Sequence, residues 1–127
     1  MAIKVLLVIS LILPIGIAKG ASHQQTQSIY REQGAAVFSS ERGAMLWLDE
    51  GIKGRNCAIC HWSNPAKPGK HVRTRKVIDP MALSVSPGRF TDPAKVEKWF
   101  KRNCKWTWGR ECSAQEKGDL LEYLYQL

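Results

Sequence analysis

Several common features are missing from this chain of 127 residues. It contains no internal repeat, no low-complexity tract and no pair of segments with the alternation expected of paired strands. A single long apolar run, residues 5–13, is well short of the roughly 20 residues needed to cross a bilayer. We therefore expect neither a repeat architecture nor a sheet, and no integral membrane segment once the N-terminal segment is removed.

Acidic residues are absent from the first twenty positions. The lone Lys4 precedes the apolar run, Pro14 then breaks any helix, and Ala18 and Gly20 place small residues where a signal peptidase reads them. This order is the layout of a secretory signal peptide. We expect residues 1–20 to be cleaved and the protein to be exported to the periplasm. Removing twenty of 127 residues leaves 107, which is enough for one domain.

The distribution of charge argues against nucleic acid as a partner. Loss of Lys4 and Lys19 lowers the formal net charge from +8 to +6. The remaining Lys and Arg residues are spread from Arg31 to Lys117, most of them between Lys53 and Lys117, and an exported protein rarely meets nucleic acid. A modestly basic surface suits an acidic protein partner or an anionic membrane face.

Three main helices are predicted, all within one all-α domain over residues 39–127. Ser39 or Ser40 can cap the first helix, over residues 39–49. The second begins at Asp92 and Pro93 and is expected to end at Asn103 and Cys104. The third starts at residues 113–116, which have the form of a capping box. Gly43 and Trp47 are placed to cross Tyr123 and Leu124 on the last helix.

Two segments are predicted to lack regular structure. Residues 21–38 begin with a polar stretch and are predicted to be a mostly flexible lead-in. The thirty residues after position 61 are rich in Pro and Gly and predict a long irregular loop. Such a loop suits a compact domain only if it wraps something that is not protein.

Residues 57–61 read Cys-Ala-Ile-Cys-His, the Cys-x-x-Cys-His motif of c-type haem attachment. The thiols of Cys57 and Cys60 would add across the two porphyrin vinyl groups, and His61 would be the proximal iron ligand. A thioredoxin-like dithiol would need a strand before the motif and a helix after it, and a zinc site would need a second ligand pair. The sequence offers neither, so we predict one covalent haem c, wrapped by the long loop.

The second axial ligand decides the function. Spacing alone offers Met81, either as that ligand or as an apolar loop residue. His71 stands among basic residues, which is typical of a solvated loop, and Met45 occupies an apolar position on the first helix. A haem ligated by His61 and Met81 would make the protein a plain electron carrier.

Two further cysteines, Cys104 and Cys112, remain in an oxidising compartment, where a disulfide is the default. Trp106 and Trp108 lie between them, either as lining of the haem pocket or as surface-loop anchors. The remaining candidates for the pocket lining are Phe90 and Met81.

A longer pattern resembles the sphaeroides haem protein family. Its most specific part is Arg-Asn-Cys at residues 102–104, followed by Gly-Arg-Glu-Cys at residues 109–112. Residues 87–100, 116–121 and 41–43 continue the likeness, which covers most of residues 40–125.

The resemblance implies a small class I cytochrome c-like fold with a high-spin haem. It implies that Asn103 is the ligand opposite His61 and that Cys104 and Cys112 form a disulfide. It also implies that electrons come from another cytochrome. We expect this partner to have an acidic docking face. It also implies that the asparagine leaves the iron on reduction, so that oxygen or nitric oxide can bind. A neutral amide is a weak ligand that favours ferric iron, which is consistent with this role.

Two alternatives remain open. The first is the plain carrier ligated by His61 and Met81. The second is a small haem reductase of nitric oxide, hydroxylamine or oxygen, although the sequence offers no evident general acid for one.

Overall fold

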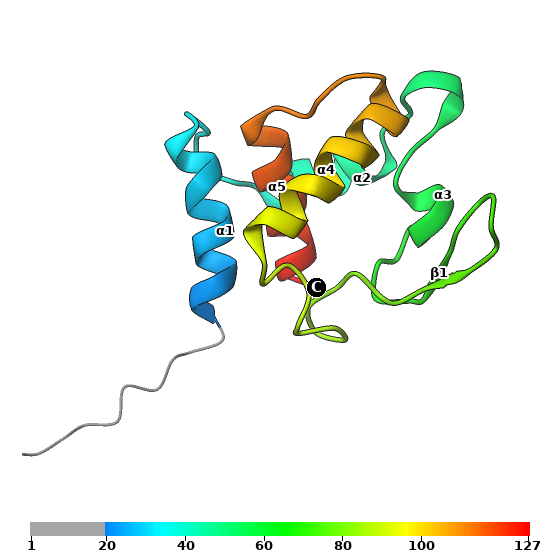
Figure 1. The fold of residues 1–127 in the computed structure, drawn as a ribbon, viewed down its shortest axis with the longest axis horizontal. Coiled ribbons are helices and arrows are strands. Elements are labelled where there is room, and N and C mark those ends of the chain that lie inside the picture. Colours follow the sequence, from blue (N-terminus) through cyan, green and yellow to red (C-terminus); the bar gives the residue numbers. More distant parts are fainter. Residues whose placement is uncertain (1–19) are drawn as a thin grey trace, which may run out of the picture.

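The computed structural model describes residues 20–127, which form a mainly helical domain (Figure 1). The predicted signal peptide lies outside the described residues except for Gly20. The elements in chain order are α1 (Gly20–Glu32), α2 (Ser40–Leu48), the 3₁₀ turn η1 (Ile52–Gly54), α3 (Ala58–His61), β1 (Gly69–Lys70), β2 (Val77–Ile78), α4 (Pro93–Trp108) and α5 (Ala114–Tyr125). Within residues 20–127, no helix is both long and apolar enough to cross a membrane.

The helices α2 and α5 pack together as the sequence predicted. A Cβ atom on Gly43 would collide with the backbone oxygen of Asp119 and would lie 2.6 Å from Tyr123 Cβ, so glycine permits the close crossing. The rings of Trp47 and Tyr123 meet edge to face, with centroids 6.0 Å apart. The predicted capping box is also present, because Ser113 and Glu116 each bond the other's backbone N–H.

The helix α4 begins at its predicted cap but ends later than predicted. The Asp92 side chain accepts a hydrogen bond from the backbone N–H of Lys95 (3.1 Å). The expected end at Asn103 and Cys104 is wrong, since the helix continues to Trp108 and stops at Gly109, whose φ is 71°. No Gly or Pro interrupts residues 104–108, and the first residue that readily adopts a left-handed conformation is Gly109. Asn103 therefore lies inside a helix.

The N-terminal segment is helical, which corrects the prediction of a flexible lead-in over residues 21–38. In α1, Thr26 and Tyr30 are only 1% and 2% exposed. The Tyr30 hydroxyl donates to Glu97 Oε2 on α4 (3.0 Å), and the Thr26 hydroxyl donates to the backbone oxygen of Phe90 (3.2 Å). The polar composition concealed the helix because its buried stripe is narrow and includes a threonine.

The predicted loop contains a small hairpin, which corrects the expectation that no strands pair. Strands β1 and β2 are antiparallel, with Gly69 opposite Ile78 and Lys70 opposite Val77. Strands of two residues are too short for an alternating pattern to reveal them. The rest of the predicted loop, up to the start of α4, contains no other strand or helix in the described chain.

Buried apolar side chains form two clusters. The first joins α1, α4 and α5 and consists of Tyr30, Phe38, Val96 and Leu121. The second lies at the crossing of α2 and α5 and consists of Trp47, Leu120 and Leu124. Cys57 packs against this second cluster, so the α2–α5 crossing supports the predicted haem motif.

Candidate functional site

The predicted haem motif occupies the single-turn helix α3 and its N-terminal flank. Asn56 starts the turn, because its side-chain oxygen accepts the backbone N–H of Ile59 (3.0 Å). The backbone N–H of His61 bonds the oxygen of Cys57 (3.1 Å), which closes the turn that carries both cysteines and the histidine. Cys57 and Cys60 are half-buried and form no disulfide.

The hairpin comes directly against this turn at Gly69. A Cβ atom there would collide with the backbone oxygen of Cys60 and would lie 3.0 Å from His61 Cα. Only glycine allows such an approach of two backbones. The glycine thus fixes the hairpin beside the proximal side of the predicted site.

His61 lies in a largely apolar environment. Its ring centroid is 5.6 Å from that of Trp47, whose indole N–H donates to the backbone oxygen of Trp62 (2.8 Å). Burial, with smaller effects of the nearby charges of Arg89 and His71, lowers the pKa of His61 to about 4. The imidazole is therefore neutral at neutral pH, as an iron ligand must be.

The buried groups of the motif fit a covalent haem. Burial raises the pKa of the Cys57 thiol to about 12, which disfavours the thiolate needed by a zinc ligand or a redox-active dithiol but does not oppose a neutral thioether. In the described part of the chain, two buried side-chain atoms have no hydrogen-bond partner. They are His61 Nδ1 and Tyr125 Oη. No hydrogen bond within these residues holds the His61 ring at Nδ1, and Nε2 is the nitrogen that would ligate the iron. Cys57 and Cys60 would hold the haem, His61 would ligate its iron, and the haem would supply a one-electron redox centre and a position for an exogenous ligand.

The structure brings together three of the four residues predicted to line the pocket. Met81, Phe90 and Trp108 pack, like Cys57, against the cluster of Trp47, Leu120 and Leu124. The Trp108 indole N–H also donates to Asp49 (2.9 Å).

Trp106 is not among the residues that pack on this cluster. Its ring stacks under the Arg55 guanidinium at 4.7 Å from the centroid, and Arg55 Nη1 donates to its backbone oxygen (3.1 Å). This contact joins α4 to the segment just before Cys57.

The two candidate distal ligands lie in different surroundings. Met81 is half-buried. Its backbone N–H donates to the backbone oxygen of Pro65 (2.8 Å), and Pro65 comes four residues after His61 in the chain. Asn103 lies on α4 with an exposed side chain. The next residue, Cys104, is buried and forms a disulfide with Cys112 across a Cα–Cα distance of 5.6 Å.

His71 has a structural role in the hairpin turn. Its Nδ1 accepts the backbone N–H groups of Arg73 (3.2 Å) and Thr74 (3.1 Å). This geometry agrees with the prediction of a loop residue, since one ring nitrogen already orders the turn.

Arg89 also contributes to the site, although no sequence motif points to it. Its guanidinium donates to the backbone oxygens of Pro80 (2.6 Å) and Asp79 (2.8 Å), and its charge lowers the pKa of His61. The backbone oxygen of Arg89 is in turn 2.7 Å from His23 Nε2 on α1. No local pattern signals these contacts, which join segments as many as 66 positions apart.

Comparisons with known proteins agree with this arrangement. A family model described as DUF1924, a domain of unknown function, matches residues 33–124. The cytochrome c-type protein SHP of Cereibacter sphaeroides is 39% identical over 112 residues, which are 85% of this chain and 86% of that protein. Cytochrome c'' of Methylophilus methylotrophus is 46% identical over 68 residues, 54% of this chain and 47% of its own length.

Solved structures of SHP and of cytochrome c'' also match this chain. The structure of oxidised SHP, described as an oxygen-binding cytochrome c, matches with a TM-score of 0.76 and 38% identity, over 83% of this chain and 96% of that one. Oxidised cytochrome c'' matches with a TM-score of 0.70 and 31% identity, over 82% and 93%. The predicted class I cytochrome c-like fold is confirmed, and the protein carries one haem c. The chain therefore belongs to the sphaeroides haem protein family of c-type cytochromes.

Proposed function

We propose that this protein is an exported, periplasmic, redox-active cytochrome whose distal ligand, Asn103, is displaced on reduction so that oxygen or nitric oxide can bind. It takes electrons from another cytochrome. The proposal concerns the ligand set and its lability, and it extends to this chain the oxygen binding named for SHP.

The observation that carries the proposal is the backbone hydrogen bond that holds Met81 to Pro65, which we call the tether of Met81. The Met81 backbone N–H bonds the oxygen of Pro65, and the side chain packs on the cluster of Trp47, Leu120 and Leu124. This residue is thus held by the segment that follows His61 and serves an apolar packing role. Such a position supports Asn103, which comes from a separate helix, as the residue opposite His61.

The surroundings of Asn103 also suit a defined but weak ligand. On α4, Asn103 lies one helical turn after Trp99 and one turn before Trp106, in the interior of a helix. The adjacent disulfide of Cys104 to Cys112 anchors this part of α4. The neutral amide of asparagine is a poorer iron ligand than a thioether or an imidazole, so reduction should weaken it further.

The optical spectrum of the purified holoprotein tests the proposal, recorded in the ferric and ferrous states before and after addition of nitric oxide. We expect high-spin bands in both states and a large shift of the ferrous bands on addition of the gas. A low-spin ferrous spectrum, with a methionine–iron charge-transfer band in the ferric state and no response to nitric oxide, would instead identify the plain carrier ligated by His61 and Met81.

A further inference from the structure

The positive charge of this chain is concentrated in the segment that contains the haem motif. Residues 51–91 contain eight Lys and Arg residues and a single acid, Asp79, so their formal net charge is +7. Residues 21–50 and 92–127 together have a net charge of −1, because the predicted mature chain has +6 in all. The excess charge therefore belongs to one segment of the molecule.

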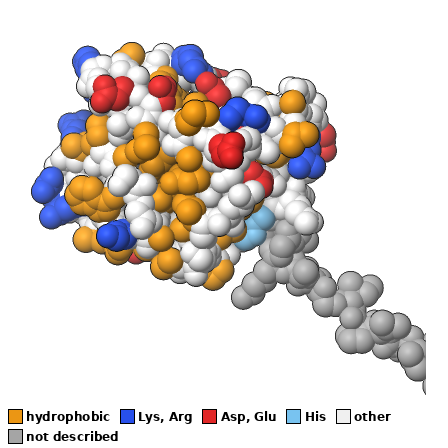
Figure 2. Space-filling model, turned by 180° about the vertical axis from the view of Figure 1, so that it is seen from behind, with side chains coloured by type: hydrophobic (Ala, Val, Ile, Leu, Met, Phe, Trp, Pro, Cys, Tyr) orange, Lys and Arg blue, Asp and Glu red, His pale blue; other side chains and the backbone are white. Residues whose placement is uncertain are grey.

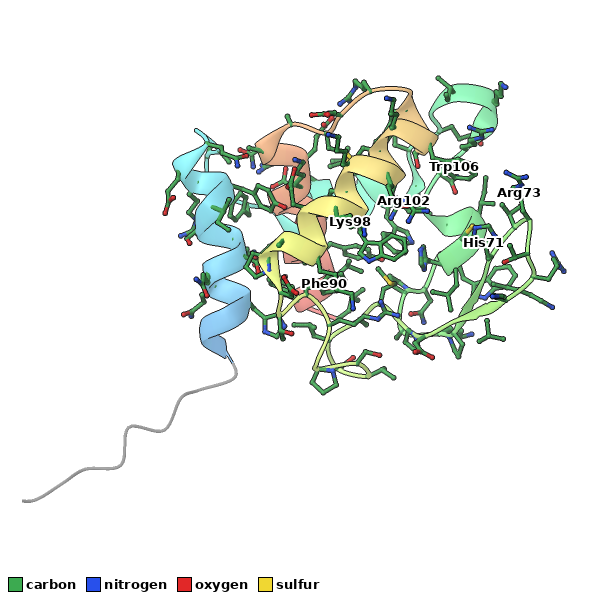
Figure 3. All side chains as sticks on the ribbon, in the orientation of Figure 1. His71, Arg73, Phe90, Lys98, Arg102 and Trp106 are labelled. Carbon is green, nitrogen blue, oxygen red and sulfur yellow. A yellow bond between two sulfur atoms is a disulfide. The ribbon has the colours of Figure 1, made fainter. Side chains whose placement is uncertain are left out.

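Most of this charge lies on the hairpin β1–β2 and the residues that flank it. Five basic side chains are exposed there: Lys67, Lys70, Arg73, Arg75 and Lys76. We call these five residues the hairpin cluster. In Figure 3, Arg73 projects from the turn of the hairpin, on the side of α3 away from α4. Figure 2 shows Lys and Arg side chains gathered along the left edge of the rotated molecule, where the hairpin lies.

The hairpin cluster is held in place but has no acidic partner in the described structure. The backbone N–H of His71 donates to the backbone oxygen of Lys76 (2.8 Å), and the backbone N–H of Arg75 donates to the backbone oxygen of His71 (2.9 Å). The three ion pairs within residues 20–127 join Arg42 to Asp119, Arg110 to Glu116 and Lys117 to Glu97, all outside the hairpin. The five charges therefore present an uncompensated positive field to solvent.

The hairpin also lies beside the proximal ligand. Gly69 touches the backbone at Cys60 and His61, as described above. Trp62, the residue directly after His61, is 50% exposed, and its indole N–H donates to the backbone oxygen of Pro68 at the base of the hairpin (2.8 Å). A protein docked on this face would stand next to the residues that hold the redox centre.

We propose that the hairpin cluster is the docking surface for an acidic redox protein that delivers electrons to this cytochrome. The inference rests on the proposed function, in which the protein accepts electrons. One electron leaves the partner, which is oxidised, and enters this protein, which is reduced; the transfer breaks no covalent bond and moves no proton, and the release of Asn103 follows the reduction. Complementary charge chiefly accelerates the encounter, so its removal should lower the association rate.

Charge reversal tests the proposal on the holoprotein. Arg73→Glu with Lys76→Glu removes two charges of the hairpin cluster and adds two acids, while Lys101→Glu with Lys105→Glu makes the same change on exposed positions of α4. Stopped-flow absorbance measures the second-order rate of reduction by an acidic flavodoxin at low and high salt. We expect the hairpin variant to react about 10- to 100-fold more slowly at low salt, with the difference disappearing at high salt. The α4 variant should react within about threefold of the wild type, because it changes overall charge alone.

Three outcomes would overturn the proposal. The first is an equal loss of rate in both variants, which would indicate a net-charge effect, and the second is no loss in the hairpin variant. The third is an unchanged reaction with flavodoxin together with lost binding to phosphatidylserine vesicles, which would assign the cluster to a membrane surface. The optical response to nitric oxide is measured on the same samples, so a failure of the gas-binding proposal is seen separately from a failure of docking. Equal melting temperatures and equal haem absorbance per protein confirm that both variants are folded and loaded.

Discussion

Asn103 and Met81 differ in what their removal should do to the haem spectrum. We predict that Met81→Leu leaves the ferric and ferrous spectra unchanged, because leucine fills similar volume in the cluster on which Met81 packs. Asn103→Leu should alter the ferric bands, since an aliphatic side chain cannot ligate iron. Absorbance spectra of the two purified variants measure both effects. A spectrum that changes only with Met81→Leu would contradict the proposed ligand set.

Gly43 is the residue on which the close packing of α2 and α5 depends. We predict that Gly43→Ala lowers the free energy of unfolding by about 1–3 kcal/mol, despite the better helix propensity of alanine, because the new Cβ collides with the Asp119 backbone. Chemical denaturation monitored by circular dichroism measures the change. Gly88→Ala is the matched control, since a Cβ atom there would have no neighbour within 4 Å. Equal losses in the two variants would refute the role of the crossing.

The pairing of helices α2 and α5 is also stabilised by a buried charge. Burial by itself would raise the pKa of Asp119. Its carboxylate, however, accepts hydrogen bonds from the Arg42 guanidinium (2.7 Å), the Ser39 backbone N–H (2.7 Å) and the Gln115 amide (2.9 Å). These bonds, together with the Arg42 charge, hold the pKa of Asp119 below its ordinary value. The folded state therefore binds the Asp119 proton less tightly than the unfolded state does. This stabilisation is complete above a pH of about 5 and is lost as the pH falls below about 4.

We predict that Asp119→Asn removes part of this acid dependence. The variant should be less stable at neutral pH, because the ion pair with Arg42 is lost, and its stability should fall less steeply between pH 5 and pH 2. Urea denaturation at a series of pH values measures the slope. Parallel curves for wild type and variant would show that Asp119 titrates alike in the folded and unfolded states.

The disulfide that joins the end of α4 to the start of α5 closes a loop of nine residues, counted from Cys104 to Cys112. We predict that Cys104→Ser with Cys112→Ser lowers the free energy of unfolding by about 2–3 kcal/mol, because the open chain gains entropy when unfolded. Thermal and urea denaturation of the holoprotein measure the loss. Wild-type protein unfolded under reducing conditions is the control and should show a similar loss, whereas an unchanged stability would mean that the bridge constrains little.

For the molecule as a whole, the haem should contribute to the stability of the fold. The core of the described chain consists of two small clusters, and Cys57 packs at the edge of one of them. We predict that Cys57→Ser with Cys60→Ser, which prevents covalent attachment, lowers the melting temperature and weakens the near-ultraviolet circular dichroism of the tryptophans. A covalent haem stays attached to the unfolded chain, but only the folded state buries its apolar faces against the protein, so loss of the haem removes that stabilisation. A variant without haem that melts at the wild-type temperature would contradict this prediction.

The positions that the sequence predicted correctly are those that depend on neighbours along the chain. Cys-x-x-Cys-His is a local covalent motif within five consecutive residues, and the caps at Ser39, Asp92 and Ser113 each act within one helical turn. The α2–α5 crossing was also predictable, because a glycine on one helix and large side chains on the other follow a common packing pattern.

The features that only the tertiary structure decided depend on contacts between distant segments. The helix α1 is placed by the hydrogen bonds of Thr26 and Tyr30 to residues 64 and 67 positions away. The positions of Arg89 and Met81 likewise depend on hydrogen bonds to the backbone oxygens of Pro80 and Pro65, which the fold brings close to them. Sequence patterns report which side chains share a face of one element, whereas a hydrogen bond to a remote carbonyl leaves no period or spacing in the chain. The chemistry of haem attachment was therefore determined by the sequence itself, while the surroundings of its two candidate distal ligands were decided by the way the helices and loops pack around it.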